Sequence, residues 1–507
     1  MLPDPLFYKL LLVGLVWLCL VLHVVWSDDR APAHLSTPLP AKPPRKRSKE
    51  PTPFAGLTHK PHCALCEHER AHPKAPAARR PEPMLPTNRR PREVDTSKHF
   101  CPHPDCAYRG WVGLGNLRAN GHPNGGPWRQ FHCTSCDGYF LETHGTLLHG
   151  KRIAADLIVR VLACLAEGLG IRATARVFEV DPNTVLQWLV DAAEQLTAFT
   201  RYFLCDVHVN QLQLDELYAV LRHVKDGEIS EDDAIKRLER SPYWVWTAMD
   251  PESKLLLVID VGTRTLAMAQ CVVHQVVQVL APDCVPLCWT DGYRDYMMAF
   301  LSHFGYWLQP SRQRAHGPAP KPRWMPLPQL LYAQVVKSYR RRRIVAVKHR
   351  VVFGTTARVK QVLAARGWQI NTAFVERLNL DIRQRVAAVG RRVNTLCKAE
   401  DGLRQQPVVF QTYHNFCLPH ASLRQPLLVP EPTNGSGSIR QWQPYTPAMA
   451  AGLTGHVWSM KEVMLFRVPP WRSLKHYKGL ARMMIVQWHR LSVPKSRCGE
   501  RNEVLKT

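Results

Sequence analysis

Strand-like and helix-like patterns alternate along residues 208–419 of the chain. Short apolar or alternating runs predict strands over 211–220, 243–249, 254–261 and 284–290. Apolar residues at helical spacing predict helices over 265–280 and 372–389. Strands interleaved with helices pack as layers, so we expect an α/β fold in which a mixed sheet is flanked by helices.

Acidic residues stand on these predicted elements. Asp215 and Glu216 lie in the first strand, Asp291 follows the fourth strand, and Glu376 lies on the later helix. Successive strand side chains point to opposite faces, so Asp215 and Glu216 are not expected to serve one site easily. Converging carboxylates need cations, and a pair of Mg²⁺ or Mn²⁺ ions about 3.5–4 Å apart supports phosphoryl transfer. Spacing alone leaves three rival carboxylates: Asp250, Asp260 and Asp295.

Four cysteines in two close pairs predict a metal site upstream of this region. Cys101 pairs with Cys106 and Cys133 with Cys136, which supplies four thiolates for a tetrahedral Zn²⁺ site in a zinc ribbon over 101–150. The alternatives are unliganded thiols, an iron–sulfur cluster, or a histidine in place of one thiolate, with the candidates His103, His122 and His132. A weaker second site would use Cys63, Cys66, His68 and His72.

Residues 151–200 have the spacing of three helices joined by short turns. Asp181 is a suitable N-cap for the third helix and Pro182 a suitable first residue. These proportions favour a helix-turn-helix domain, in which Asn183, Thr184 and Gln187 would contact DNA. The alternative is an ordinary small helical bundle.

The chain is strongly basic, with 67 Lys and Arg against 41 Asp and Glu and a formal net charge of +26. This surplus favours a polyanionic partner, most simply nucleic acid, over a small neutral ligand. The alternative is a basic enzyme with no such partner. A run of four basic residues is predicted to contact phosphates, unless it is only a solvated loop: Arg340, Arg341, Arg342 and Arg343.

The two ends of the chain differ from its middle. Residues 6–26 are almost wholly apolar and just long enough to cross a bilayer, so they are either a membrane anchor or the product of a start codon assigned too early. Residues 27–100 are rich in proline and basic residues and predict an extended linker. Residues 420–507 are predicted to form a loop-rich C-terminal tail with short helices near 447–453 and 460–466.

Three blocks follow one another along the chain: Asp215-Glu216-Leu217-Tyr218, Trp289-Thr290-Asp291-Gly292-Tyr293, and residues 375–384 around Glu376. In this order they resemble the catalytic blocks of bacterial transposases of the insertion-sequence-one group. The resemblance covers roughly residues 101–419. It implies an RNase H-like core with a catalytic triad of Asp215, Asp291 and Glu376, and a DNA-holding Arg383. The interval from Asp291 to Glu376 is longer than the resemblance implies, and we interpret the surplus as a basic insertion near 310–355.

The resemblance therefore predicts a metal-dependent transposase. It would bind the terminal inverted repeats of its element and join 3′ hydroxyl ends to target DNA, as a homo-oligomer in the cytoplasm with the nucleoid. Two alternatives stay open. One is an inactive or domesticated transposase that only binds DNA. The other is a membrane-anchored protein whose cysteines form disulfides.

Overall fold

The computed structural model describes residues 80–84, 94–219, 243–282, 284–310, 320–340, 343–365, 367, 372–390, 400–432 and 439–470. All of them belong to one compact unit, Thr52–Thr507. The apolar segment 6–26, most of the linker, and the second Cys/His candidate site lie outside the described residues. Among the helices that are described, none combines the length and apolarity that a membrane span requires.

The segment with the paired cysteines forms a three-stranded antiparallel sheet in the order β1-β2-β3. The strands are β1 (Leu117–Ala119), β2 (Gln130–Cys133) and β3 (Tyr139–Leu141), and a short 3₁₀ turn, η1 (Pro123–Gly125), lies between the first two. Its buried core is small and includes three of the four cysteines: Cys101, Cys106, Leu117, Phe131, Cys133 and Phe140.

Three helices follow, as the apolar spacing predicts. They are α3 (Ala155–Ala166), α4 (Ile171–Val177) and α5 (Pro182–Phe203). The Asp181 side chain accepts a hydrogen bond from the backbone N–H of Asn183, which confirms Asp181 as the N-cap of α5. The helices join one buried cluster through residues such as Val161, Val185 and Leu189.

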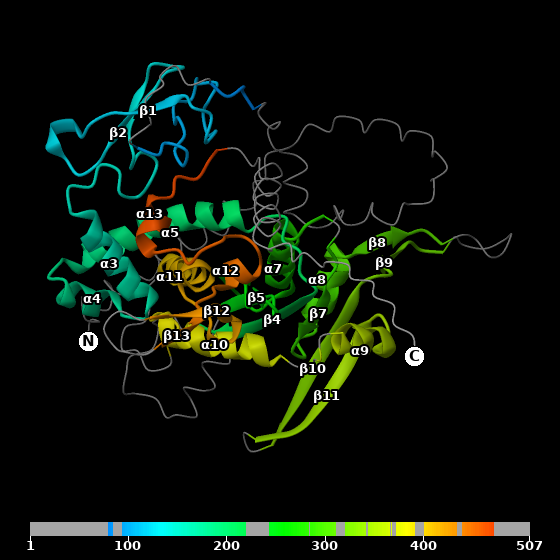
Figure 1. Ribbon diagram of the computed structural model, residues 1–507. Coiled ribbons are helices and arrows are strands. Elements are labelled where there is room, and N and C mark those ends of the chain that lie inside the picture. Colours follow the sequence, from blue (N-terminus) through cyan, green and yellow to red (C-terminus); the bar gives the residue numbers. More distant parts are fainter. Residues whose placement is uncertain are drawn as a thin grey trace, which may run out of the picture. The chain divides into compact units, whose positions relative to one another are not determined.

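A six-stranded mixed sheet in the order β11-β10-β7-β4-β5-β6 lies at the centre of the compact unit (Figure 1). β4 pairs in parallel with β7, and β7 with β10, whereas β5, β6 and β11 run antiparallel to their neighbours. The strand order is compatible with an RNase H-like core. The strands are β4 (Gln211–Tyr218), β5 (Trp244–Met249), β6 (Leu256–Gly262), β7 (Leu287–Thr290), β10 (Leu331–Arg340) and β11 (Arg343–Phe353).

Helices cover both faces of this sheet. On one face, Leu212 and Leu214 of β4 belong to the buried cluster that includes α7 (Leu266–Val279) and α8 (Asp295–His303). On the other face, Leu217 shares a cluster with α10 (Ala373–Arg385) and α11 (Glu400–Thr412). A further helix, α9 (Thr356–Ala364), packs near β7 and β10. The α/β prediction is confirmed at this level.

The segment interpreted as a basic insertion contains part of the sheet. Residues 331–335 of β10 are buried, and this strand pairs directly with β7, so the sheet would be incomplete without it. Among the other described residues of this segment, β9 (Arg323–Pro326) pairs with the preceding strand β8 (Gly305–Leu308), and β11 lies at the edge of the six-stranded sheet. In the sequence, the run of arginines that begins at Arg340 follows the short buried half of β10 closely, so no clear strand pattern marks this segment.

In the segment predicted as a tail, the described residues, 420–432 and 439–470, include helices that pack against the core. After α11 the chain forms a π-helical turn, η2 (Tyr413–Cys417), and a 3₁₀ turn, η3 (Ala421–Leu423). A hairpin of β12 (Gln425–Pro432) and β13 (Ile439–Gln443) follows, and then α12 (Pro447–Ala450) and α13 (Met460–Leu465). The side chains of Val463 and Met464 are fully buried in the cluster that contains α5.

Buried His414 makes the stability of this region depend on pH. Its Nε2 donates to the carbonyl oxygen of Lys254 (3.0 Å), and burial lowers the pKa of His414 to about 4. The unfolded chain therefore binds more protons below pH 6.5, and we expect about 3 kcal/mol of stability to be lost as the pH falls from 6.5 to 4. Urea midpoints measured across this range test it. His414→Gln should remove this part of the dependence of stability on pH. An unchanged pH dependence in that variant would show that His414 is not its source.

Candidate functional site

Three carboxylates converge where the parallel strands β4 and β7 adjoin. In this pair Gln213 lies opposite Trp289, so Asp215 and Asp291 come level with each other two residues further along. One ligand oxygen each from Asp215, Glu216 and Asp291 lie within 4.8 Å of one another. Two of the three predicted catalytic carboxylates are therefore brought together by the register of the sheet.

The expectation that Asp215 and Glu216 cannot easily share a site is wrong. The adjacent strand residues Leu214 and Leu217 do lie on opposite faces of the sheet. The Asp215 carboxylate nevertheless lies close to Glu216, because it accepts a hydrogen bond from the backbone N–H of Glu216 (2.9 Å). Its other oxygen accepts from the side-chain amide of Asn379 on α10 (2.8 Å). Thr247 supports the arrangement by donating to the backbone carbonyl of Asp215 (3.0 Å).

Arg264 neutralises part of this acidic cluster. Its guanidinium donates to Glu216 Oε1 (2.8 Å from Nε) and lies 3.7 Å from Asp291 Oδ2. The rings of Trp244 and Tyr293 contact it at 4.7 and 4.4 Å, which holds the cation in place. Sequence reasoning missed this residue because its partners come from three distant segments, and no local pattern marks it.

Burial and mutual repulsion disfavour the charged forms of two of the carboxylates. The pKa of Asp215 is raised well above its ordinary value, first by burial and then by the charges of Glu216, Asp291 and Glu376. Burial and Asp291 raise the pKa of Glu216 to about 7, although Arg264 and the Tyr296 hydroxyl (3.1 Å) oppose the shift. A divalent cation bound by these oxygens would offset the repulsion, so the residues fit a magnesium or manganese site.

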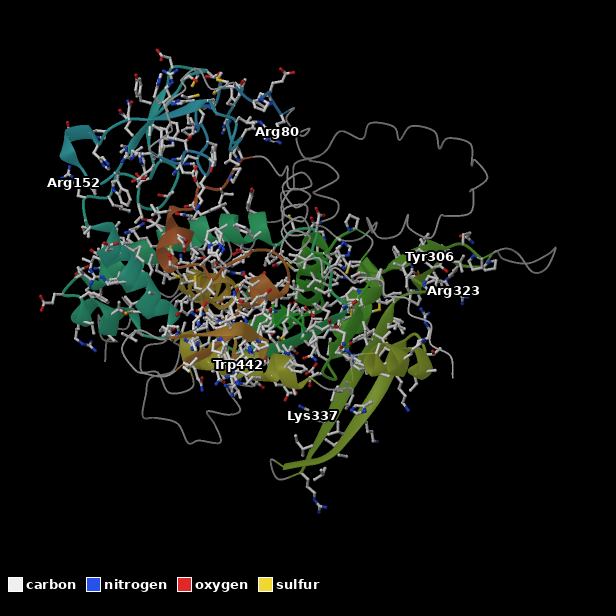
Figure 2. The ribbon with its side chains drawn as sticks, in the orientation of Figure 1. Arg80, Arg152, Tyr306, Arg323, Lys337 and Trp442 are labelled. Carbon is white, nitrogen blue, oxygen red and sulfur yellow. The ribbon has the colours of Figure 1, made fainter. Side chains whose placement is uncertain are left out.

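Glu376 lies beside the cluster rather than within it. It stands in the first turn of α10, where it forms an ion pair with Lys337 of β10 and accepts from the Thr372 hydroxyl (2.5 Å). Lys337 is labelled in Figure 2, on the hairpin that β10 forms with β11. Glu376 is close enough for its charge to raise the pKa of Asp215. Arg383 lies two turns further along α10, about 10 Å from Glu376 along the helix axis.

The three rival carboxylates have other partners. Asp250 accepts from Ser253 (Oγ at 2.5 Å) within a turn, and Asp260 accepts from Gln275 (2.6 Å). Asp295 accepts from the Tyr293 hydroxyl (2.8 Å). None of them belongs to an acidic group of metal-binding geometry among the described residues.

The four cysteines of the small sheet form a second candidate metal centre. Cys101 Sγ lies 3.6 Å from Cys136 Sγ, and Cys106 Sγ lies 3.8 Å from Cys133 Sγ. Four sulfur atoms about 2.3 Å from one ion stand about 3.8 Å apart in a tetrahedron, so these distances fit a single Zn²⁺. They are far longer than a disulfide bond, and all ten cysteines in the described ranges are free.

The surroundings of the cysteines also suit thiolate ligands. Burial opposes a thiolate at Cys133, but the backbone N–H of Cys136 and the Asn116 amide (3.3 Å) favour it, and the pKa of Cys133 is lowered. Burial raises the pKa of Cys101, so a positive ion at the centre is needed to keep that sulfur deprotonated. Two of the alternative histidines have partners elsewhere, since His132 pairs with Asp137 (2.6 Å) and His122 contacts the carbonyl oxygen of Gly126.

The predicted DNA-contacting residues lie apart in the chain. Asn183 and Gln187 are exposed on the first turns of α5, and Thr184 is partly exposed. Arg340 is exposed at the end of β10. Of the remaining arginines, Arg341 and Arg342 lie outside the described residues, and for Arg343 only the backbone, at the start of β11, is described.

No protein-family model matches the chain, and no curated protein shows significant sequence similarity to it. The class that the fold and the site define is therefore a broad one: a mixed α/β chain with an acidic cluster at one position in its sheet and a four-cysteine cluster in a separate small sheet.

Proposed function

We propose that this chain is a metal-dependent transposase that cuts DNA and transfers strands, with Asp215, Asp291 and Glu376 as ligands of Mg²⁺ or Mn²⁺. The observation that carries the proposal is the convergence of Asp215 and Asp291 from adjacent parallel strands of a sheet compatible with an RNase H-like core. Asp215, Asp291 and Glu376 would hold the divalent ions, which would supply activation of the attacking hydroxyl and stabilisation of the leaving oxygen.

The position of α10 supports Glu376 as the third ligand. Asn379 touches Asp215, and the backbone N–H of Val375 donates to the Gln213 side chain (3.1 Å), so the helix start is fixed against β4. Residues i and i+3 of a helix have Cβ atoms about 5–6 Å apart, which places Glu376 one step from the contact that Asn379 makes. The side chain of Glu376 is half-exposed and its charge already acts on Asp215, so metal binding would require it to exchange Lys337 for the ion.

Glu216 and Arg264 have a positioning role in this proposal. Arg264 donates to one Glu216 oxygen and Tyr296 donates to the other, so this carboxylate already has a partner at each oxygen. Through Glu216, Arg264 is held 3.7 Å from Asp291, where it limits the repulsion between Asp291 and Asp215.

We assign DNA binding to the segments before the catalytic core. The four cysteines would hold Zn²⁺ in a zinc ribbon, and α3, α4 and α5 would form a helix-turn-helix that presents Asn183, Thr184 and Gln187 to the terminal repeats. The exposure of Asn183 and Gln187 at the start of a capped helix supports this assignment. Action as a homo-oligomer on DNA belongs to the same proposal.

The proposal is tested with purified full-length chain, Mg²⁺ and labelled duplexes that carry the ends of the DNA flanking its gene. We expect cleavage and strand transfer that require divalent metal, and a loss of both of at least about 10³-fold in Asp215→Asn and Asp291→Asn. The control is Asp250→Asn, because Asp250 caps a turn outside the cluster. Equal activity in all four proteins would contradict the mechanism.

One observation favours a second candidate, a chain that binds DNA without cutting it. Glu376 is engaged by Lys337 and Glu216 by Arg264, so two carboxylates already have cationic partners. The same experiment decides between the two. Salt-sensitive DNA binding with no metal-dependent nicking, in parent and variants alike, would identify the non-catalytic protein.

A further inference from the structure

The hairpin of β10 and β11 is exposed along most of its outer half. It runs on as a two-stranded ribbon past the neighbouring strands of the sheet (Figure 1). Every residue of β11 from Ile344 to Arg350 is exposed, and the large apolar side chains Ile344, Val345 and Val347 are 52%, 58% and 47% exposed. A surface of this kind on both faces of a ribbon calls for a partner.

The sign of the charge on this ribbon identifies the chemistry of that partner. The chain has no Asp or Glu between Asp295 and Glu376, while the same stretch contains 14 Lys and Arg. On the ribbon itself, Arg340, Lys348 and Arg350 are described and exposed. A second copy of the chain would bring an equally acid-free ribbon and would be repelled, whereas a polyanion is attracted.

The strand pairing connects the position of these basic residues with that of the acidic cluster. Lys348 lies opposite Val336, and Arg350 lies opposite Gln334, so each pair shares one face of the ribbon. The Gln334 amide donates to the carbonyl oxygen of Tyr293 (3.2 Å), two residues from Asp291. The face that carries Lys348 and Arg350 is therefore continuous with the turn that holds Asp291.

We propose that the β10–β11 ribbon is an arm that binds duplex DNA along its phosphate backbone, next to the strand position that is cut. This inference rests on the proposed function for its choice of DNA. A two-stranded ribbon fits the major groove, which is about 12 Å wide. From Gln334 to Arg340 the strand spans about 20 Å, which corresponds to about six base pairs at 3.4 Å each. The exposed valines contact sugars and thymine methyl groups there.

The test compares DNA binding by the full chain and by Lys348→Ala/Arg350→Ala. Fluorescence anisotropy with a random-sequence duplex is measured against NaCl concentration, without added Mg²⁺, so that cleavage plays no part. Each lost phosphate contact lowers the slope of log K against log[salt] by about 0.9, and we expect a slope shallower by about 1.8 in the double variant. In footprints at fixed salt, the variant loses protection over about six base pairs at one flank.

The matched control is Arg424→Ala/Arg440→Ala, which removes two exposed charges at the separate hairpin of β12 and β13: Arg424 directly precedes β12 and Arg440 lies in β13. This control should keep the parent slope. If Lys348→Ala/Arg350→Ala has the same slope of log K against log[salt] as the parent chain, the DNA arm is overturned and the proposed function still stands. The same holds if the slope is unchanged but the oligomeric mass changes, a result that would assign the ribbon to a second copy. A parent chain that binds no DNA overturns both proposals. Lys348→Gln/Arg350→Gln, which keeps the side-chain stems, should reproduce the effect of the alanine pair.

Discussion

Glu376→Gln is expected to lower the rate of metal-dependent DNA cleavage by at least about 10³-fold, whereas Glu216→Gln is expected to lower it by about tenfold or less. Loss of a carboxylate ligand removes several kcal/mol of transition-state stabilisation, and each 1.36 kcal/mol corresponds to a factor of ten in rate. Glu216 instead has Arg264 and Tyr296 as partners, so its amide analogue disturbs only the position of Arg264. Single-turnover cleavage of a labelled duplex measures both.

The two substitutions form a matched pair, because each replaces one carboxylate oxygen with an amide nitrogen, Glu216→Gln within the acidic cluster and Glu376→Gln directly beside it. Thermal unfolding and DNA affinity should stay near the parent values in Glu376→Gln, since Glu376 is half-exposed. The reverse outcome, a large loss in Glu216→Gln and a small one in Glu376→Gln, would make Asp215, Glu216 and Asp291 the ligand set. That result would leave the Lys337–Glu376 pair as a purely structural contact.

The sequence predicted the parts of this site that depend on local pattern. Apolar alternation and strand ends predict Asp215 within one strand and Asp291 directly after another, and the structure then shows that these strands, β4 and β7, pair in a register that brings the two residues level. Helical spacing placed Glu376 and Asn379 on one helix, but it did not predict that Asn379, rather than Glu376, would contact Asp215. Such contacts depend on side-chain rotamers and on neighbouring cations, which no single segment specifies.

The parts that could not be predicted are long-range. Arg264, which follows β6, reaches its site only because β5, β7 and β4 bring Trp244, Tyr293 and Glu216 around it. Strand β10 falls in the segment that the sequence predicts as a basic insertion, because its buried half is short and a run of arginines follows closely in the sequence. Arg467 joins two segments that are far apart in the sequence, because its guanidinium donates to the carbonyl oxygens of Phe100 and Leu141 (2.9 and 3.0 Å), and no local pattern predicts this contact.

Removal of zinc is expected to unfold the small sheet while the central sheet stays folded. The buried core around β1, β2 and β3 consists of six residues, three of them cysteines, which is too little apolar surface to hold a segment of this size. Structural zinc sites in small peptides contribute about 10–16 kcal/mol of apparent binding free energy, so the ion would supply most of the stability here. We expect about one zinc per chain and its loss in Cys133→Ser.

Hydrogen exchange tests this prediction, because it measures the protection of backbone amides separately in each segment. In Cys133→Ser, or after chelation, amides of β2 and β3 should exchange as an unfolded chain does, whereas those of β4 and β5 keep their protection. Cys164→Ser is the control, because Cys164 lies on α3, outside the four-cysteine cluster. Retained zinc and unchanged exchange in Cys133→Ser would exclude this thiolate as a ligand. Bound iron in place of zinc would favour the cluster alternative, although four sulfurs within 4.8 Å of one another enclose the volume of a single ion.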